Sequence, residues 1–168
     1  MANAPSAAVQ RLVDVVAQLR NPATGCPWDL EQTHASLVPY VLEEAHEVAD
    51  AIRQGDDQHL KEELGDLLLQ VVLHAQIAGE EQRFDLNAIA DGISNKLIRR
   101  HPHVFGDAEA KTSDDVRRSW DAIKLEEQAE ALAGSTSPLS ERLKTKVRGL
   151  PALAGAMTIS KKAAKAGF

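Results

Sequence analysis

Two pairs of acidic residues are the part of this sequence best suited to chemistry. Glu44 and Glu47 are three residues apart, and so are Glu63 and Asp66. Residues three apart share one face of a helix, so each pair can direct its carboxylates at a common point. Four carboxylates at one point repel one another unless a cation lies between them, and oxygen ligands alone select a hard ion such as Mg²⁺ or Mn²⁺. The spacing therefore predicts a metal site of the kind that binds the phosphate groups of a substrate.

An acidic helix face that simply contacts water is the alternative interpretation of these residues. Around the first pair, four acidic side chains fall within an arc of about 120° in a helix: Glu43, Glu44, Glu47 and Asp50. Asp66 argues against a solvated face, because leucines 67–69 follow it directly and a carboxylate among buried leucines needs a compensating partner. His59 and Lys61 lie upstream, and we expect neither to neutralise the pair. The two pairs together favour a metal ion.

Two other arrangements are weaker candidates for reactive sites. Glu43 and His46 match the Glu-x-x-His element of di-iron helix bundles, but such a site requires a second element of this type and the sequence has one. Cys26 is the single cysteine and lies in the turn Gly25–Trp28. We expect it to be a half-buried structural residue, because an activated thiol needs a base beside it.

Basic residues gather at the end of a later predicted helix, where Lys96, Arg99 and Arg100 lie close together. Cations at a helix C-terminus are stabilising in their own right, which is one reason for such a cluster. In an acidic protein with a predicted metal site the cluster also suits a polyphosphate, since the arginine fork binds phosphate oxygens in pairs. Trp120 and Lys124 are one helical turn apart, so Trp120 can stack on a base or pack in the core, and Lys124 can reach a phosphate.

The composition is that of an ordinary globular protein and argues against several other classes. The chain has 168 residues, 43% of them hydrophobic, and a formal net charge of −6. These values predict a domain with its own core and argue against direct binding of nucleic acid. The sequence has no run of about eighteen apolar residues and no secretory signal within residues 1–10, so we expect no membrane span. A single cysteine fits the reducing cytoplasm.

Helical periodicity extends over almost the whole chain, and no stretch alternates as a strand does. Helices are predicted within residues 1–133 at about 7–19 with Ser6 as N-cap, 36–54, 57–78, 85–100 and 113–133. Residues 101–106 are expected to form a loop, 134–150 a linker, and 151–168 a C-terminal helical segment. The polar turn Gly55–Asp57 makes the two acidic helices antiparallel neighbours. We therefore expect an all-α helical bundle.

The third predicted helix is apolar on nearly every side. Leu64, Leu68 and Val71 lie on one face, and Leu69 and Leu73 lie on another. A helix of this kind is typically central and buried. Its apolar surface exceeds what three or four helices readily cover, so we expect a second copy of the chain to bury the rest in a homodimer.

Six segments, in this order, resemble the MazG family of nucleoside triphosphate pyrophosphohydrolases. They are Gly25–Asp29, Leu42–Glu47, Glu62–Leu68, Arg83–Asp85, Lys96–Phe105 and Trp120–Lys124. The resemblance implies the all-α NTP pyrophosphatase fold, a homodimer, and Mg²⁺-dependent hydrolysis of nucleoside or deoxynucleoside triphosphates to the monophosphate and pyrophosphate. Nothing in the sequence selects one base or one sugar, since a tryptophan stacks on any base.

The resemblance also implies roles for residues at matching positions. The metal ligands would be Glu44, Glu47, Glu63 and Asp66. The nucleotide would be bound by Lys61, Glu62, Lys96, Arg99, Arg100, Trp120 and Lys124. We expect Glu43 or Glu47 to act as the base toward the attacking water. Lys96 and Arg100, together with Arg99, would offset the charge that develops on the pyrophosphate leaving group.

The sequence departs from the family pattern in the number of acidic modules. Two-domain members carry a second copy of the two acidic pairs, whereas this sequence contains one. Residues 150–168 resemble the connector into that second copy, so we expect either a natural short form or the N-terminal half of a longer protein. Two other functions therefore stay open: a non-catalytic nucleotide-binding or dimerisation module, and a scaffold that binds a protein partner.

Overall fold

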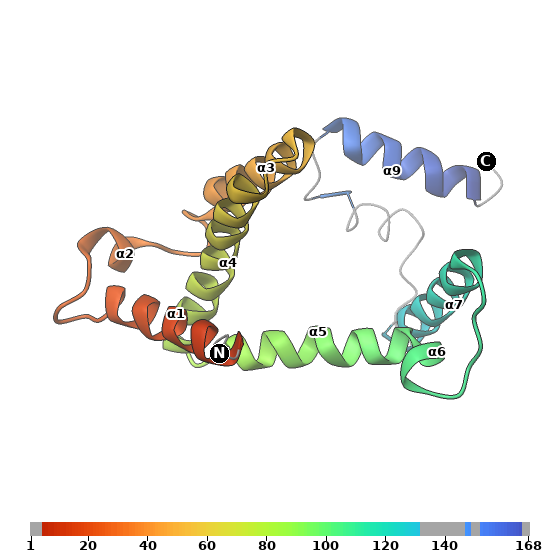
Figure 1. Ribbon diagram of the computed structural model, residues 1–168, viewed down its shortest axis with the longest axis horizontal. Helices are drawn as coiled ribbons and strands as arrows, with labels where there is room; N and C mark the ends of the chain where they lie inside the picture. The colour runs from red at the N-terminus through yellow and green to blue at the C-terminus, as the bar shows by residue number, and fades with distance from the viewer. Residues whose placement is uncertain (1–4, 132–146, 149–151, 166–168) are drawn as a thin grey trace. The chain divides into compact units, whose positions relative to one another are not determined.

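The structure is a computed structural model that describes residues 5–131, 147–148 and 152–165, and these residues form helices and turns without a strand. The helices are α1 Pro5–Leu19, α2 Pro27–Glu31, α3 Val38–Gln54, α4 Asp57–Glu80, α5 Leu86–Arg100, α6 Pro102–Phe105, α7 Ser113–Ala131 and α9 Ala152–Lys165 (Figure 1). They belong to two units, residues 1–97 and residues 98–168. The predicted all-α fold is confirmed, and no described helix is both long and apolar enough to cross a membrane. The predicted linker lies outside the described residues except for 147–148.

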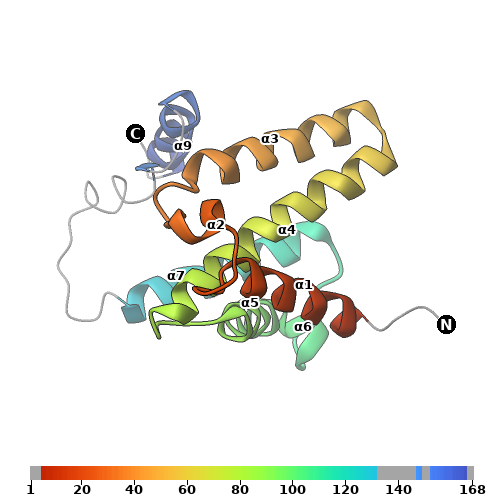
Figure 2. The same cartoon turned by 90° about the vertical axis from the view of Figure 1, so that its left-hand side faces the viewer.

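The turn between α3 and α4 forms as the sequence predicts. Gly55 adopts the left-handed conformation with φ 72°, which glycine reaches without steric cost, and its N–H donates to the Ala51 carbonyl at 3.0 Å. Asp56 then caps α4, its carboxylate accepting from the N–H groups of Gln58 and His59, each at 3.0 Å. The two helices consequently lie side by side as an antiparallel hairpin (Figure 2).

The C-terminal half of α4 is the centre of the first unit. Its Val72, Leu73 and Ile77 are buried together with Val16 of α1 and with Leu37, which precedes α3. The N-terminal half is more open, since Leu64 is 48% exposed and Leu68 is 40% exposed. The prediction of a central, buried helix is therefore right for the second half of α4 and wrong for the first half within one chain.

Two predicted helix starts differ from the structure. The first helix begins at Pro5, so Ser6 lies within α1 and is not its N-cap. The helix expected from about residue 36 begins at Val38. Ser36 instead closes the preceding turn, because its hydroxyl accepts from the Thr33 N–H at 2.9 Å.

Two segments expected to be turn or loop contain short helices. Pro27 starts α2, and the predicted loop 101–106 contains α6, in which a proline again occupies the first turn. Cys26 is half-buried, as predicted. Gly25 before it has no room for a side chain, since a Cβ there would lie 2.3 Å from the Leu19 carbonyl oxygen. Trp28 is 48% exposed and meets Tyr40 edge-on, with ring centroids 5.7 Å apart.

One buried arginine joins three parts of the first unit. Arg20, at the end of α1, is 8% exposed and its Nη2 lies 2.7 Å from the Glu80 Oε2 at the end of α4. It also donates to the backbone carbonyls of Asp29 in α2 and, at 3.3 Å, of Gln32. The hydrogen bonds from Arg20 lower the pKa of Glu80. Glu80 therefore stabilises the fold in its charged form.

Glu80→Gln should lower the free energy of unfolding by about 1–2 kcal/mol at neutral pH, because it leaves the buried Arg20 without its counter-charge. The same loss should occur in the parent protein under acid. Because the pKa of Glu80 is lowered on folding, its contribution is present above the ordinary value of 4.5 and is lost as the pH falls through the folded pKa. Urea unfolding measures both effects.

Glu81→Gln is the matched control, since Glu81 pairs with Arg83 at the surface, where the two side chains are 56% and 41% exposed. Its effect should stay within about 0.5 kcal/mol. Equal effects of the two substitutions would contradict a special role for the Arg20 ion pair.

Candidate metal site and anion-binding cluster

The α3–α4 hairpin brings three of the four predicted metal ligands together. Glu44 of α3 and Glu63 and Asp66 of α4 each place a carboxylate oxygen within 4.8 Å of the others. Glu44 and Glu63 are half-buried and Asp66 is exposed. Glu47, the fourth predicted ligand, is exposed and is not one of this group. The turn at Gly55 thus produces the convergence that the spacing predicted.

Burial and the neighbouring carboxylates both act on the pKa of Glu44. Its pKa is raised above the ordinary 4.5, first by burial and then by the negative charges of Asp66, Glu47, Glu63 and Glu43. A raised pKa means that the folded protein holds the ionised form of Glu44 at a cost. A cation at this point would remove that cost, so the charge distribution favours one.

The donor set fits a hard divalent cation. Mg²⁺ takes oxygen ligands at about 2.0–2.1 Å, so oxygens on opposite sides of one ion are about 4.2 Å apart, and Mn²⁺ accepts the same ligands. Three carboxylate oxygens within 4.8 Å of one another are compatible with a shared ion after small side-chain adjustments. Among the described residues this is the group of acidic, histidine and cysteine side chains with such spacing.

One expectation about the neighbours of this site was wrong. The Nε2 of His59 lies 2.9 Å from the Glu63 Oε1, one turn along α4, so His59 does partner the carboxylate pair. A single ring N–H engages one of the carboxylate oxygens in the cluster and leaves the others for an ion. Lys61 is exposed and makes no ion pair with the described residues. Glu62 is exposed and accepts a hydrogen bond from Gln58 at 2.7 Å.

The second unit contains a separate cluster of predicted substrate-binding residues. Arg99 and Arg100 at the end of α5 both bind Glu127 of α7, with Nη2–oxygen distances of 2.5 Å each. The Arg100 guanidinium carbon lies 5.0 Å from the centre of the Trp120 ring, and the His101 ring meets that tryptophan edge-on at 5.1 Å. The structure therefore joins Arg99, Arg100 and Trp120, which the sequence indicated separately. We call these residues, with Glu127, the arginine cluster.

The sequence analysis missed Glu127. Hydrogen bonds from Arg100 and then Arg99 lower the pKa of Glu127 to about 2, so it stays ionised at neutral pH. A signal was present, because Glu127 follows Trp120 by seven residues, close to two helical turns, and so lies on the same face. Lys124 is half-buried on α7, and Lys96 is exposed near the end of α5.

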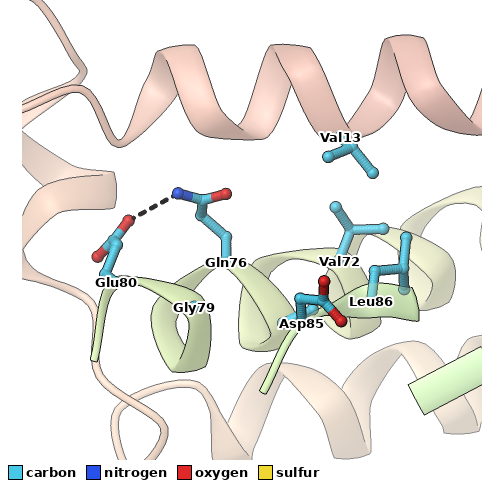
Figure 3. A pocket seen from close by; sticks show the side chains of 8 residues that line it. Val13, Val72, Gln76, Gly79, Glu80, Asp85 and Leu86 are labelled. Carbon is cyan, nitrogen blue, oxygen red and sulfur yellow. Dashed lines mark hydrogen bonds between the residues drawn. The ribbon is translucent and has the colours of Figure 1, made fainter. Parts of the chain in front are cut away.

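A pocket of about 260 Å³ lies elsewhere in the first unit, between α1, α4 and the start of α5 (Figure 3). Val13 and Leu86 contribute apolar walls. Its two carboxylates already have partners: Glu80 binds Arg20 and accepts from Gln76 at 3.1 Å, and Asp85 accepts from the Ala88 N–H at 2.8 Å. These groups stabilise the fold, and none of them is a predicted site residue.

Comparison with known proteins identifies a domain of the chain. Residues 32–105, which include the whole α3–α4 hairpin, match the MazG nucleotide pyrophosphohydrolase domain. A nucleoside triphosphate pyrophosphohydrolase of Escherichia coli is 49% identical over 160 residues, covering 95% of this chain. The chain contains a MazG domain at residues 32–105.

Other MazG proteins extend the comparison to structure and length. The Thermotoga maritima protein named nucleoside triphosphate pyrophosphohydrolase/pyrophosphatase MazG is 41% identical over 162 residues. The crystal structure of a MazG-related protein from Thermotoga maritima matches with a TM-score of 0.58 at 27% identity, over 69% of this chain and 98% of that one. This chain spans 59% of the Escherichia coli protein and 58% of the Thermotoga maritima nucleoside triphosphate pyrophosphohydrolase/pyrophosphatase, which is less than two thirds of the length of each.

Glu44→Gln should stabilise the metal-free protein, because it removes one of the repelling charges without changing the size of the side chain. In EDTA the midpoint of thermal unfolding should rise by about 1–3 °C at neutral pH. A raised folded pKa means that the parent gains stability as the pH falls, so the difference should shrink toward pH 4.5. With Mg²⁺ or Mn²⁺ added, the parent should gain stability and the variant should gain less.

Differential scanning fluorimetry with and without the ion measures these shifts. Glu31→Gln, at an exposed position in α2 outside the group, is the control for loss of one negative charge. A Glu44 variant that is less stable than the parent in EDTA and responds equally to the ion would contradict the metal site.

Proposed function

We propose that this chain hydrolyses nucleoside triphosphates to nucleoside monophosphate and pyrophosphate, with Mg²⁺ as cofactor and Mn²⁺ as a substitute. The observation that carries the proposal is the convergence of Glu44, Glu63 and Asp66 on the α3–α4 hairpin. The names of the Escherichia coli and Thermotoga maritima relatives, both nucleoside triphosphate pyrophosphohydrolases, support it. Carboxylates that converge on one point suit chemistry on a polyanion only through a cation.

The carboxylates of the hairpin would have two roles, binding the cation and accepting a proton. Glu44, Glu63 and Asp66 would hold the cation, with Glu47 as a further ligand. The bound cation would screen the phosphate charges and withdraw electrons from the phosphorus that is attacked. Glu43 and Glu47 are exposed on α3 beside these ligands, and one of them would accept the proton of the attacking water. The bond that breaks joins the bridging oxygen to the α phosphorus, so pyrophosphate leaves.

The basic and aromatic residues would bind the nucleotide. Lys96, Arg99 and Arg100 would offset the negative charge that grows on the departing pyrophosphate. Trp120 would stack on the base. The remaining residues proposed to contact the nucleotide are Lys61, Glu62 and Lys124.

We also propose a range of substrates and a cellular compartment for this activity. A tryptophan face stacks on any base, so we propose that triphosphates of different bases are substrates, and the substrate class includes nucleoside and deoxynucleoside triphosphates. The roles open to such an enzyme are removal of non-standard nucleotides and control of nucleotide pools. We place this activity in the cytoplasm, whose reducing conditions suit the free Cys26 thiol.

Pyrophosphate release tests the proposal directly. With Mg²⁺, members of a panel of nucleoside and deoxynucleoside triphosphates should yield pyrophosphate and the monophosphate in equal amounts, and EDTA should stop the reaction. Asp66→Asn and Glu63→Gln should each lower kcat/KM by at least about a hundredfold, while circular dichroism stays unchanged. Glu31→Gln is again the control. Full Mg²⁺-dependent turnover by the Asp66 variant would refute the site, and nucleotide binding without turnover would point to the non-catalytic module.

We propose in addition that a second copy of the chain covers the hairpin. Leu42 and Ile52 of α3 are 52% and 60% exposed, and Leu64, Leu68 and Val71 of α4 are 38–48% exposed. Apolar side chains of this number on neighbouring helices indicate an interface.

Light scattering after gel filtration should give twice the chain mass at micromolar concentration. Leu64→Lys combined with Leu68→Lys changes two positions one turn apart on α4 and should produce a monomer. Lysines at the exposed positions Gln58 and Glu62, one turn apart at the start of the same helix, provide the control for added charge. A monodisperse parent monomer would remove the argument for the dimer.

A further inference from the structure

We infer that Glu127 is a positioning residue that holds Arg99 and Arg100 as a pair and fixes Arg100 against the face of Trp120. Its Oε1 accepts from the Arg99 Nε at 2.6 Å, and its Oε2 accepts from the Arg100 Nη2 at 2.5 Å. The Arg100 Nε adds a longer contact to Oε1 at 3.3 Å. One carboxylate therefore sets the orientation of two guanidinium groups. The consequence for catalysis rests on the proposed function, in which these arginines bind the triphosphate.

The contacts of Glu127 leave part of each arginine for another anion. They involve the Nε and Nη2 atoms of Arg99 and Arg100 and neither Nη1 atom. A guanidinium has five N–H donors in a fixed plane, so a group bound on one edge still presents donors on the other. One carboxylate also neutralises only one of the two positive charges. The cluster therefore keeps a net positive charge while its geometry is fixed.

Arg99 and Arg100 differ in burial, and this difference predicts that they depend on Glu127 to different degrees. The side chain of Arg100 is 13% exposed and that of Glu127 is 18% exposed, whereas the side chain of Arg99 is 61% exposed. A charge as buried as that of Arg100 depends on its counter-charge, and the surface charge of Arg99 does not. We therefore expect loss of the Glu127 charge to displace Arg100 most and to leave Arg99 as a mobile surface side chain.

Trp120 is coupled to this ion pair through Arg100. The guanidinium carbon lies 5.0 Å from the indole centre, within the range of a cation–π contact. Glu127 lies about two turns farther along α7, so one helix presents both the ring and the carboxylate to Arg100. Removing the carboxylate should consequently loosen the cover over one face of Trp120 and disturb the surface on which a base would stack.

Glu127→Gln distinguishes positioning from simple charge compensation, because the two roles predict opposite results. If Glu127 only competed with the substrate for the arginines, removing its charge would tighten nucleotide binding. If Glu127 positions them, the glutamine variant should lower kcat/KM for a nucleoside triphosphate about tenfold, because the displaced arginines no longer meet the phosphates. Glu126→Gln is the matched control, since Glu126 lies next to Glu127 in the sequence, is exposed and makes no ion pair with the described residues.

Acrylamide quenching of tryptophan fluorescence supplies a readout that needs no substrate. The chain has two tryptophans, so a Trp28→Phe background leaves Trp120 as the single indole. In that background Glu127→Gln should raise the quenching constant of Trp120 about twofold, because Arg100 no longer stays on the ring. Glu126→Gln should match the parent, and circular dichroism should show the same helix content in all three proteins.

The combined results decide each claim separately. A raised quenching constant together with a lowered kcat/KM supports the positioning role. Unchanged quenching, or tighter nucleotide binding by Glu127→Gln, overturns it even if the parent is an active enzyme. A parent that neither binds nor hydrolyses nucleotides overturns the proposed function, and in that case quenching alone still decides whether Glu127 holds Arg100 on Trp120.

Discussion

The tight turn between α3 and α4 holds carboxylates close together although their charges repel one another. The candidate site of the first unit depends on this constraint. The α3–α4 hairpin brings Glu44, Glu63 and Asp66 together although burial, and then the charges of its acidic neighbours, raise the pKa of Glu44. The hairpin tolerates this arrangement because buried apolar side chains fix the C-terminal half of α4 independently of the acidic residues. Carboxylates held together in this way favour the binding of a cation. Without a cation they lower the stability of the folded protein.

The second unit brings together like charges of the opposite sign, and here a counter-charge is present. Two guanidinium groups that would repel each other share the carboxylate of Glu127, and the more buried one, Arg100, also rests on Trp120. Positive charge is therefore fixed in place before any anion arrives, whereas His59 is the one basic partner of the clustered hairpin carboxylates among the residues that the structure describes. The first unit thus holds undercompensated negative charge, and the second unit holds positive charge that is fixed by a carboxylate.

Sequence reasoning identifies the local turn between the acidic helices, but it misses one local pairing and one pairing between distant residues. Gly55 and Asp56 predict the turn between α3 and α4, because glycine suits a left-handed helix end and aspartate suits a helix N-cap. The acidic spacing then predicts three of the carboxylates that converge, whereas Glu47 is not one of the group. The pairing of His59 with Glu63 was missed, although the i,i+4 spacing of the two residues indicates it. Glu127 is different, because nothing in the sequence pairs residue 127 with residues 99 and 100; that pairing depends on how α7 packs beside the end of α5.

Binding of Mn²⁺ followed by electron paramagnetic resonance tests the central claim most directly, because the signal of the free hydrated ion disappears when the ion binds. We predict saturable binding to the parent protein without nucleotide, and loss of that binding in Glu63→Gln, whose carboxylate lies within 4.8 Å of the other two. Binding that is unchanged in this variant, or absent from the parent both with and without a nucleoside triphosphate, would contradict the account.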